Sequence, residues 1–372
     1  MTSHCADMPE RIVPRLAAET SVLLDLVRVL AALAVFVLHF SYHRFSGGLF
    51  WQFGFLGGRA VDVFFVLSGF LIAYSVRGGR VSARRYAVAR LARVYSVAGP
   101  ALILTLACNL ACLALGSPGR VPPSSADIPP MVLFISNALF LGDVWDIHWI
   151  FGSNEPYWSL MFECWYYLGF GLALYLPARL RVVGVLMAAA LAGPRIVVLA
   201  PLWLFGAALL PVVLRDRVGA RMGVALILAG IGLFAWLPWS DLPGFAALDF
   251  APVTWARVWD AQQNMLTAVS FGCVIVGVNA ARRLVSPVLM AIARPVTALA
   301  GASFALYLFH YPLLELSVAL SPWPVGSWPQ RGFSSFGVFA VIWLLSRVTE
   351  QRKQAWSRLF DRMMPRVPVR VV

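Results

Sequence analysis

The chain of 372 residues carries little charge. Asp, Glu, Lys and Arg together make up 13% of it, about half the share found in an average soluble domain. Hydrophobic residues make up 60%, against roughly 45–50% in soluble domains, and the mean hydropathy is +0.78. A soluble fold of this length leaves much of its surface in water and cannot hide so much apolar area. The composition therefore excludes a soluble enzyme and a disordered chain, and it indicates a polytopic membrane protein.

Lysine is almost absent. The net charge of +13 arises from 30 Lys and Arg residues, of which only Lys353 is a lysine. Most of the arginines lie in short segments between apolar runs, which is how membrane proteins set their orientation. A surface that binds nucleic acid would need one continuous basic face, so we expect no nucleic acid partner.

Cysteine is also scarce. The five cysteines are an odd number and include no CxxC spacing. Four of them, Cys108, Cys112, Cys164 and Cys273, lie in or beside apolar runs, where cysteine behaves as a small hydrophobic residue. The sequence therefore predicts neither a disulfide framework nor a metal site.

Long apolar runs predict an all-α bundle of about ten transmembrane helices, since a span needs about 20 apolar residues. The predicted spans are 22–40, 57–76, 95–116, 158–176, 181–194, 196–214, 222–238, 264–280, 297–318 and 333–349. The stretch 131–142 is too short to span, so we expect it to re-enter the membrane or lie in the interface. No internal repeat of fixed period is visible, which weakens the reading of a transporter built from inverted repeats.

The distribution of basic residues predicts that both termini are cytoplasmic. In that topology 23 of the 30 Lys and Arg residues lie in cytoplasmic segments, six lie on the opposite side and Arg28 lies within the first span. This asymmetry follows the positive-inside rule. We expect a multi-pass protein of the cell (inner) membrane with a cytoplasmic segment 1–21, a transmembrane domain 22–349 and a basic cytoplasmic tail 350–372. Two long loops, 117–157 and 239–263, would face the other side.

Ionisable residues inside apolar spans are costly, so each one is a candidate for function. Asp25 and Arg28 share a helix face and can form a local ion pair instead. His39, Asp62 and Glu163 all fall toward the outer half of the predicted bundle, and a histidine with a nearby carboxylate suits acyl or proton transfer. His310 lies in the ninth span, where hydrogen-bonded packing is the commoner role for a single histidine.

A basic segment precedes the third span and contains Arg84, Arg85, Arg90 and Arg93. Arg90 and Arg93 are three residues apart, so they share one face of a helix. Such a pair can grip phosphates through bidentate hydrogen bonds. It can also anchor the topology by binding anionic lipid, and the spacing alone favours this second role.

Five sequence blocks resemble the membrane-bound acyltransferase-3 family of O-acyltransferases, in the order that family has them. They are Leu24-Asp25-Leu26-Val27-Arg28 through His39, the run 60–72 (AVDVFFVLSGFLI), Arg90-Leu91-Ala92-Arg93-Val94-Tyr95 as an RxxR motif, Trp158-Ser159-Leu160-Met161-Phe162-Glu163, and the run 303–312 (SFALYLFHYP). The blocks extend from about residue 22 to 318. Together the five blocks are specific to this family, although each block alone is only moderate evidence for it.

The resemblance implies an integral membrane enzyme that moves an acyl group from cytoplasmic acyl-CoA, with acetyl-CoA as the first candidate, to a hydroxyl of an acceptor. It implies that His39 is the catalytic histidine and that Asp62 and Glu163 are carboxylates in or near the site. It also shifts the preferred role of Arg90 and Arg93 to donor binding, with Arg84 and Arg85 beside them. The acceptor would be a carbohydrate, a lipid-linked sugar or a secondary metabolite.

One rival class stays open at this stage. A multi-span transporter or flippase could use the buried His, Asp and Glu side chains to relay protons or to bind its substrate. A catalytic histidine would instead act as general base on the acceptor hydroxyl or as a transient acyl carrier. His39 lies about 17 residues from the cytoplasmic end of its helix, or roughly 25 Å at 1.5 Å per residue. The thioester must therefore thread deep into the bundle, or a second group must relay the acyl unit.

Overall fold

The computed structural model describes residues 15–79, 81–117, 119, 121–239 and 253–364. Within these residues the chain folds into helices joined by loops, with no β-strand. Long helices follow from the composition, because a backbone in lipid must satisfy its hydrogen bonds within its own segment. The prediction of an all-α polytopic membrane protein is confirmed.

The longest helices cover most of the predicted spans. They are α1 (Ala18–Phe40), α3 (Gly54–Val76), α4 (Ala83–Ala114), α6 (Tyr157–Tyr175), α7 (Ala178–Ala192), α8 (Pro194–Arg215), α9 (Ala220–Trp236), α10 (Val253–Ala280), α11 (Arg282–Ala300), α12 (Ser303–Leu320) and α13 (Trp328–Val348). The short elements are α2 (His43–Ser46), α5 (Pro130–Ala138), α14 (Lys353–Met363) and the 3-10 helices η1 (Trp51–Phe53), η2 (Pro123–Ser125), η3 (Val144–Asp146), η4 (Leu237–Trp239) and η5 (Glu350–Arg352). Residues 1–14 and 365–372 of the predicted terminal segments, and 240–252 of the second predicted loop, lie outside the described residues.

The set of candidate spans differs in part from the ten runs predicted. Among the described residues, nine helical segments are long and apolar enough to cross a membrane. Helix α6, with its several Trp and Tyr residues and Glu163, and the 15-residue helix α7 do not meet that measure. Helix α11 does meet it, although most of it falls between the predicted spans 264–280 and 297–318. Pro287, Pro295 and three arginines interrupt its apolar run.

Helix α11 packs along the first part of α1. Ser286 Oγ donates to Glu19 Oε1 at 2.8 Å, and a small apolar cluster joins Val22 and Leu23 of α1 to Leu289 and Val296 of α11. These contacts lie near the end of α1 that the arginine count assigns to the cytoplasm. We call this end of the bundle, where α1 begins and α12 begins, the arginine-rich end.

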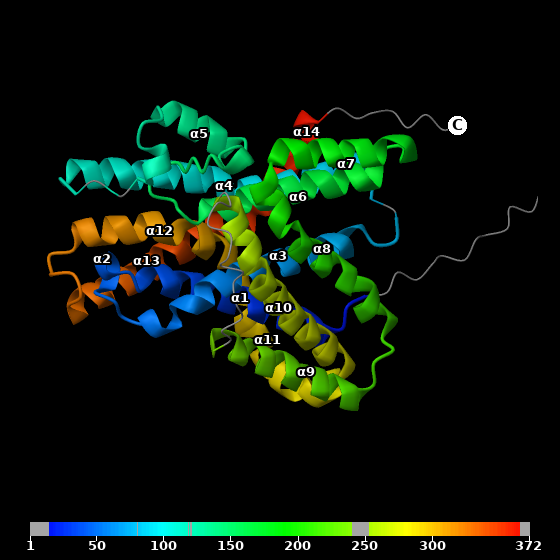
Figure 1. The fold of residues 1–372 in the computed structure, drawn as a ribbon. Helices are drawn as coiled ribbons and strands as arrows, with labels where there is room; N and C mark the ends of the chain where they lie inside the picture. The colour runs from blue at the N-terminus through cyan, green and yellow to red at the C-terminus, as the bar shows by residue number, and fades with distance from the viewer. Residues whose placement is uncertain (1–14, 80, 118, 120, 240–252, 365–372) are drawn as a thin grey trace, which may run out of the picture.

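Helices α1 and α3 lie between two groups of helices (Figure 1). In this view α4, α5, α6 and α7 lie on one side and α9, α10 and α11 on the other. One continuous core of buried apolar side chains links α1, α3, α4, α6, α8 and α12. The candidate site residues therefore project from helices of a single packed unit.

Helices α3 and α8 cross at close range because each has a glycine at the contact. A Cβ on Gly69 would lie 1.9 Å from the carbonyl oxygen of Trp203, and one on Gly206 would lie 2.0 Å from that of Val66. Small residues of this kind let membrane helices approach closely. The approach allows Trp203 Nε1–H to donate to Ser68 Oγ at 3.0 Å, which links α8 to the interior of the bundle.

Candidate active site

A cavity of about 490 Å³ opens near the arginine-rich end of the bundle. Helices α1, α3, α4, α6, α12 and α14 contribute its walls. Four basic side chains line it, namely Arg28, Arg90, Arg93 and Lys353, and apolar side chains that include Phe64, Leu71 and Phe304 cover much of the rest. Such a space can hold a ligand that is anionic at one end and less polar at the other.

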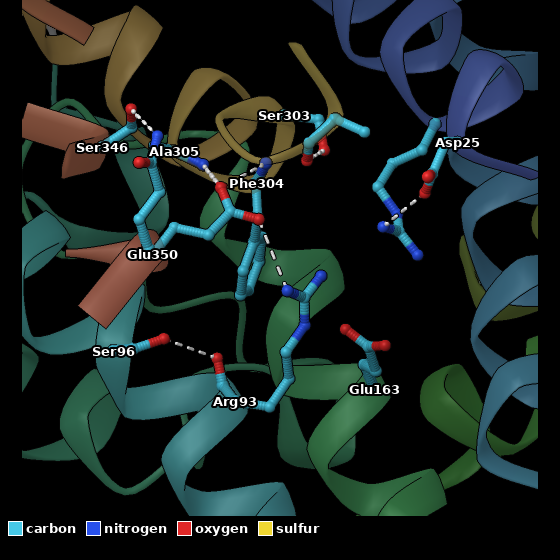
Figure 2. A network of polar contacts seen from close by, with 12 residues as sticks. Asp25, Arg93, Ser96, Glu163, Ser303, Phe304, Ala305, Ser346 and Glu350 are labelled. Atoms are coloured by element: carbon cyan, nitrogen blue, oxygen red, sulfur yellow. Dashed lines mark hydrogen bonds and ion pairs between the residues drawn. The ribbon is translucent and has the colours of Figure 1, made fainter. Parts of the chain in front are cut away.

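Arg93 is fixed by a buried carboxylate. Its Nη1 lies 3.3 Å from Glu350 Oε1, and its guanidinium lies 4.9 Å from the centroid of the Phe304 ring. Glu350 Oε2 accepts hydrogen bonds from the backbone N–H groups of Phe304 and Ala305, both at 3.1 Å, so the carboxylate caps the first turn of α12. Figure 2 shows Arg93 between Glu350 and Glu163. Glu350 is not among the predicted site residues, because it falls in the predicted tail 350–372.

Arg90 has no acidic partner among the residues that the structure describes. Its guanidinium lies 5.8 Å from the ring centroids of Tyr86 and Tyr167, and its buried Nε has no hydrogen-bond partner there. A buried guanidinium N–H without an acceptor is unfavourable. Because Arg90 also lines the cavity, an anionic ligand bound there could supply the missing acceptor.

Arg84 and Arg85 do not line the cavity. Arg84 Nη1 pairs with Asp361 Oδ1 of α14 at 2.6 Å, and its Nε and Nη2 donate to the carbonyl oxygen of Met364 at 3.3 and 3.0 Å. Arg85 is exposed. Of the four arginines predicted to bind the donor, the structure thus brings two into the cavity, and Arg84 holds α14 instead.

Glu163 lies in the wall of the cavity. Its Oε1 accepts hydrogen bonds from Ser68 Oγ and from Tyr167 OH, and Ser68 in turn accepts from Trp203. This network joins α3, α6 and α8 around one carboxylate. The structure therefore groups Glu163 with the arginines of the cavity, whereas the sequence analysis grouped it with His39.

Asp62 is buried and pairs with an arginine on its own helix. The Arg59 Nη1 to Asp62 Oδ2 distance is 3.6 Å, and Arg59 Nη1 also donates to Asn264 Oδ1 of α10 at 2.8 Å. Asp62 does not line the cavity. Arg59 thus connects Asp62 of α3 to Asn264 of α10.

His39 is hydrogen-bonded to His310. The two side chains are 7% and 0% exposed, and His39 Nδ1 lies 2.9 Å from His310 Nε2. His310 Nδ1 lies 2.8 Å from the carbonyl oxygen of Leu306, which can only accept, so Nδ1 of His310 carries the proton. In the neutral ring its Nε2 must then accept, and His39 Nδ1–H must donate. This leaves Nε2 of His39 as an unprotonated base.

A polar group lies beside the histidine pair. The rings of His39 and Tyr311 are 5.0 Å apart, edge to face. Arg44 donates to Tyr311 OH, and its Nη1 lies 2.6 Å from Glu315 Oε1. Glu315 is not among the predicted site residues, although it is an acidic residue within the predicted span 297–318 and so meets the same criterion as Glu163.

A multi-helix membrane bundle with a basic cavity and a buried, oriented histidine is compatible with a membrane enzyme that transfers a group from an anionic donor. The family model described as "Acyltransferase domain", that of the acyltransferase-3 family, matches residues 22–347. The chain therefore belongs to the acyltransferase-3 family, a family of acyl-transferring enzymes, and the resemblance drawn from its motifs is confirmed.

One curated relative and the solved structures complete the comparison. The chain is 32% identical over 181 residues to "Acyltransferase MdmB" of Streptomyces mycarofaciens, a match that covers 47% of this chain and 43% of the relative. The match thus spans less than half of that relative's length. No solved structure matches the chain.

Proposed function

We propose that the protein transfers an acyl group, acetyl in the first instance, from cytoplasmic acyl-CoA to a hydroxyl of a carbohydrate or similar acceptor. One observation carries the proposal: a basic cavity at the arginine-rich end lies in the same bundle as a buried histidine whose Nε2 is available as a base. The basic cavity suits the phosphates of the donor, and His39 Nε2 can accept the proton of the acceptor hydroxyl.

Arg90 is the principal donor-binding residue in this proposal. Its guanidinium lines the cavity and has no carboxylate partner among the described residues, so it can form two parallel hydrogen bonds with a phosphate. Arg93 lies one turn away and shares the cavity, but it already contacts Glu350. Arg93 would therefore add positive charge and stabilise the cavity wall, while Arg90 would form the direct contact with the donor phosphate.

His39 acts as the general base. The acceptor hydroxyl oxygen forms a bond to the thioester carbonyl carbon while its proton moves to His39 Nε2, and the carbon–sulfur bond then breaks. The CoA thiolate leaves and takes that proton from His39, so the ester and free CoA are the products. His310 accepts from His39 Nδ1–H throughout, which keeps the ring oriented and stabilises the imidazolium that forms transiently.

The reacting thioester has to extend beyond the cavity. Arg28 lines the cavity but His39 does not, and the rise along α1 from Arg28 to His39 is about 16 Å. Helix α12 offers the route, because Phe304 and Tyr307 line the cavity and His310 lies one turn beyond Tyr307. The acyl end would follow this helix toward His39, either directly or through a transient acyl-histidine.

The proposal is tested by incubating the purified full-length protein with acyl-CoA that carries a labelled acyl group. We expect CoA release that depends on acceptor and transfer of label to a hydroxyl of a glycan or metabolite. Mass spectrometry of surface glycans and metabolites from cells with and without the gene would identify the acceptor. A protein that binds neither acyl-CoA nor CoA and releases no thiol with any such acceptor would contradict the proposal.

A further inference from the structure

Helix α14 lies outside the matched family region but lines the cavity. The family match ends at residue 347, whereas Lys353, Gln354 and Ser357 of α14 belong to the cavity wall. Positions 353, 354 and 357 share one face of a helix. A segment that the sequence predicts to be only a basic tail therefore forms one side of the cavity that we assign to the donor.

Helix α14 is held in place at both ends. Near its C-terminal end, Arg84 of α4 pairs with Asp361 at 2.6 Å and donates to the carbonyl oxygen of Met364 at 3.0 Å. The ring centroids of Phe360 and Tyr95 of α4 are 5.7 Å apart. Just before its first turn, Glu350 caps α12 and contacts Arg93. These contacts keep the 353–357 face turned toward the cavity.

Lys353 is the one lysine in 372 residues. It forms no salt bridge with any carboxylate in the part of the chain that the structure describes. It lines the cavity together with Arg28, Arg90 and Arg93. Arg28 pairs with Asp25 and Arg93 pairs with Glu350, which leaves Arg90 and Lys353 as the cavity-lining cations with no salt bridge among the described residues. These two cations are suited to the phosphates of a ligand in the cavity.

We propose that α14 is part of the donor site: Lys353 binds phosphate oxygens of acyl-CoA at the cavity mouth, and the Arg84–Asp361 pair positions α14 for this contact. The inference rests on the proposed function, because it assumes that acyl-CoA occupies the cavity. It assigns Arg84 a positioning role and gives the segment beyond the family region a direct part in binding.

The presence of a single lysine permits a direct test on the full-length protein. An amine-reactive acetylating reagent can modify only Lys353 and the N-terminal amine, and mass spectrometry of the digested protein measures both. CoA at ten times its Kd should lower the rate of Lys353 modification about tenfold, since about a tenth of the sites remain free. The N-terminal amine, which serves as the internal control, should react at an unchanged rate.

Kinetics separate this inference from the proposed function. Lys353→Ala should raise KM for acyl-CoA about tenfold, the loss expected for one charge-assisted hydrogen bond, and should leave kcat unchanged. Arg358→Ala and Arg362→Ala are matched controls, because both residues are exposed on α14 and neither lines the cavity. If CoA did not change the rate of Lys353 acetylation in a protein that turns over acyl-CoA, the inference would be overturned and the proposed function would stand. A protein without acyl-CoA binding or turnover would overturn both.

A charge exchange tests the role of Arg84. Arg84→Asp and Asp361→Arg should each raise KM for acyl-CoA, and the double variant should recover much of the loss because the pair re-forms across α4 and α14. If Arg84 instead held the donor phosphate itself, the exchange would leave KM as high as in Arg84→Asp. That result would overturn the positioning role.

Discussion

At the scale of single residues, the histidine pair has the most exacting geometry. A carbonyl oxygen fixes the proton on His310, His310 fixes the proton on His39, and the order of these contacts determines which ring nitrogen is free. The expected partner of His39 was a carboxylate, as in many hydrolases. A neutral histidine orients the ring without adding a buried negative charge, which would be costly at this depth in a membrane bundle.

Replacement of His39 by Ala should abolish acyl transfer while expression and thermal stability in detergent stay close to wild type. The reason is that Nε2 of this ring is the proposed proton acceptor. His43 on α2 has the same side chain but lies outside the histidine pair, so His43→Ala should keep most of the activity. Transfer of a labelled acyl group across pH 5–8 measures both variants, and wild-type activity should fall at low pH as the base becomes protonated. A folded and active His39→Ala protein would contradict the mechanism.

His310 should act on rate rather than on donor binding. In His310→Phe the acceptor for His39 Nδ1–H is lost, so the ring can rotate or change tautomer, and we expect kcat to fall about 10²-fold, as for other small misplacements of a catalytic group. KM for acyl-CoA should not change. His310→Gln keeps an acceptor oxygen and should recover part of kcat. Equal kcat for the Phe and Gln variants would show that His310 only fills space.

Arg90 and Arg93 should respond differently to the same substitution. Arg90→Lys keeps the charge but loses the bidentate geometry, so we expect KM for acyl-CoA to rise about tenfold with little change in melting temperature. Arg93→Lys also weakens the contact with Glu350, which caps α12, so its melting temperature should fall as well. Steady-state kinetics and thermal unfolding in detergent test both. If both variants kept the wild-type KM for acyl-CoA, Arg90 and Arg93 would serve only to anchor the topology.

At the scale of helices, the sequence predicts most elements and misplaces a few for identifiable reasons. The apolar runs predict α1, α3, α8, α9 and α13 closely, because hydropathy reports the length of a lipid-exposed helix. Helix α11 interrupts its apolar run with Pro287 and Pro295, yet the backbone stays helical, since prolines are tolerated where neighbouring helices pack. Helix α14 is held by contacts with α4, and the local sequence pattern of α14 does not predict these contacts.

The crossing of α3 and α8 should tolerate no added side-chain atom. A Cβ at Gly69 meets a backbone carbonyl at 1.9 Å, so Gly69→Ala must separate the helices and should destabilise the protein by about 1–3 kcal/mol. The shift would also carry Trp203 away from Ser68 and disturb Glu163. Gly58→Ala is the matched control on the same helix, since nothing lies within 4 Å of its Cβ. Thermal unfolding in detergent should separate the two, and equal melting temperatures would contradict the close packing.

At the scale of the whole molecule, the candidate site residues divide between two levels of the bundle. The sequence placed His39, Asp62 and Glu163 together by predicted depth alone, because a one-dimensional reading gives neither the offset of each helix along the bundle nor its tilt. The structure places Glu163 with Arg90 and Arg93 in the cavity and pairs His39 with His310. Helix α12 joins the two levels, since Phe304 contacts Arg93 and His310 contacts His39.

In the proposed function the donor phosphates bind in the cavity and the catalytic histidine lies at another level, so the enzyme should accept acyl-CoA from one side of the membrane only. The topology predicted from the arginine count puts the cavity end on the cytoplasmic side, and acyl-CoA does not cross a bilayer. Membrane vesicles that expose the cytoplasmic face should therefore release CoA when acyl-CoA and acceptor are supplied, whereas sealed vesicles of the opposite orientation should be inactive until detergent opens them. Arg90→Lys should raise KM in the active vesicles only. Full activity in sealed vesicles that expose the outer face would reverse the topology, and with it the assignment of the basic cavity to a cytoplasmic donor.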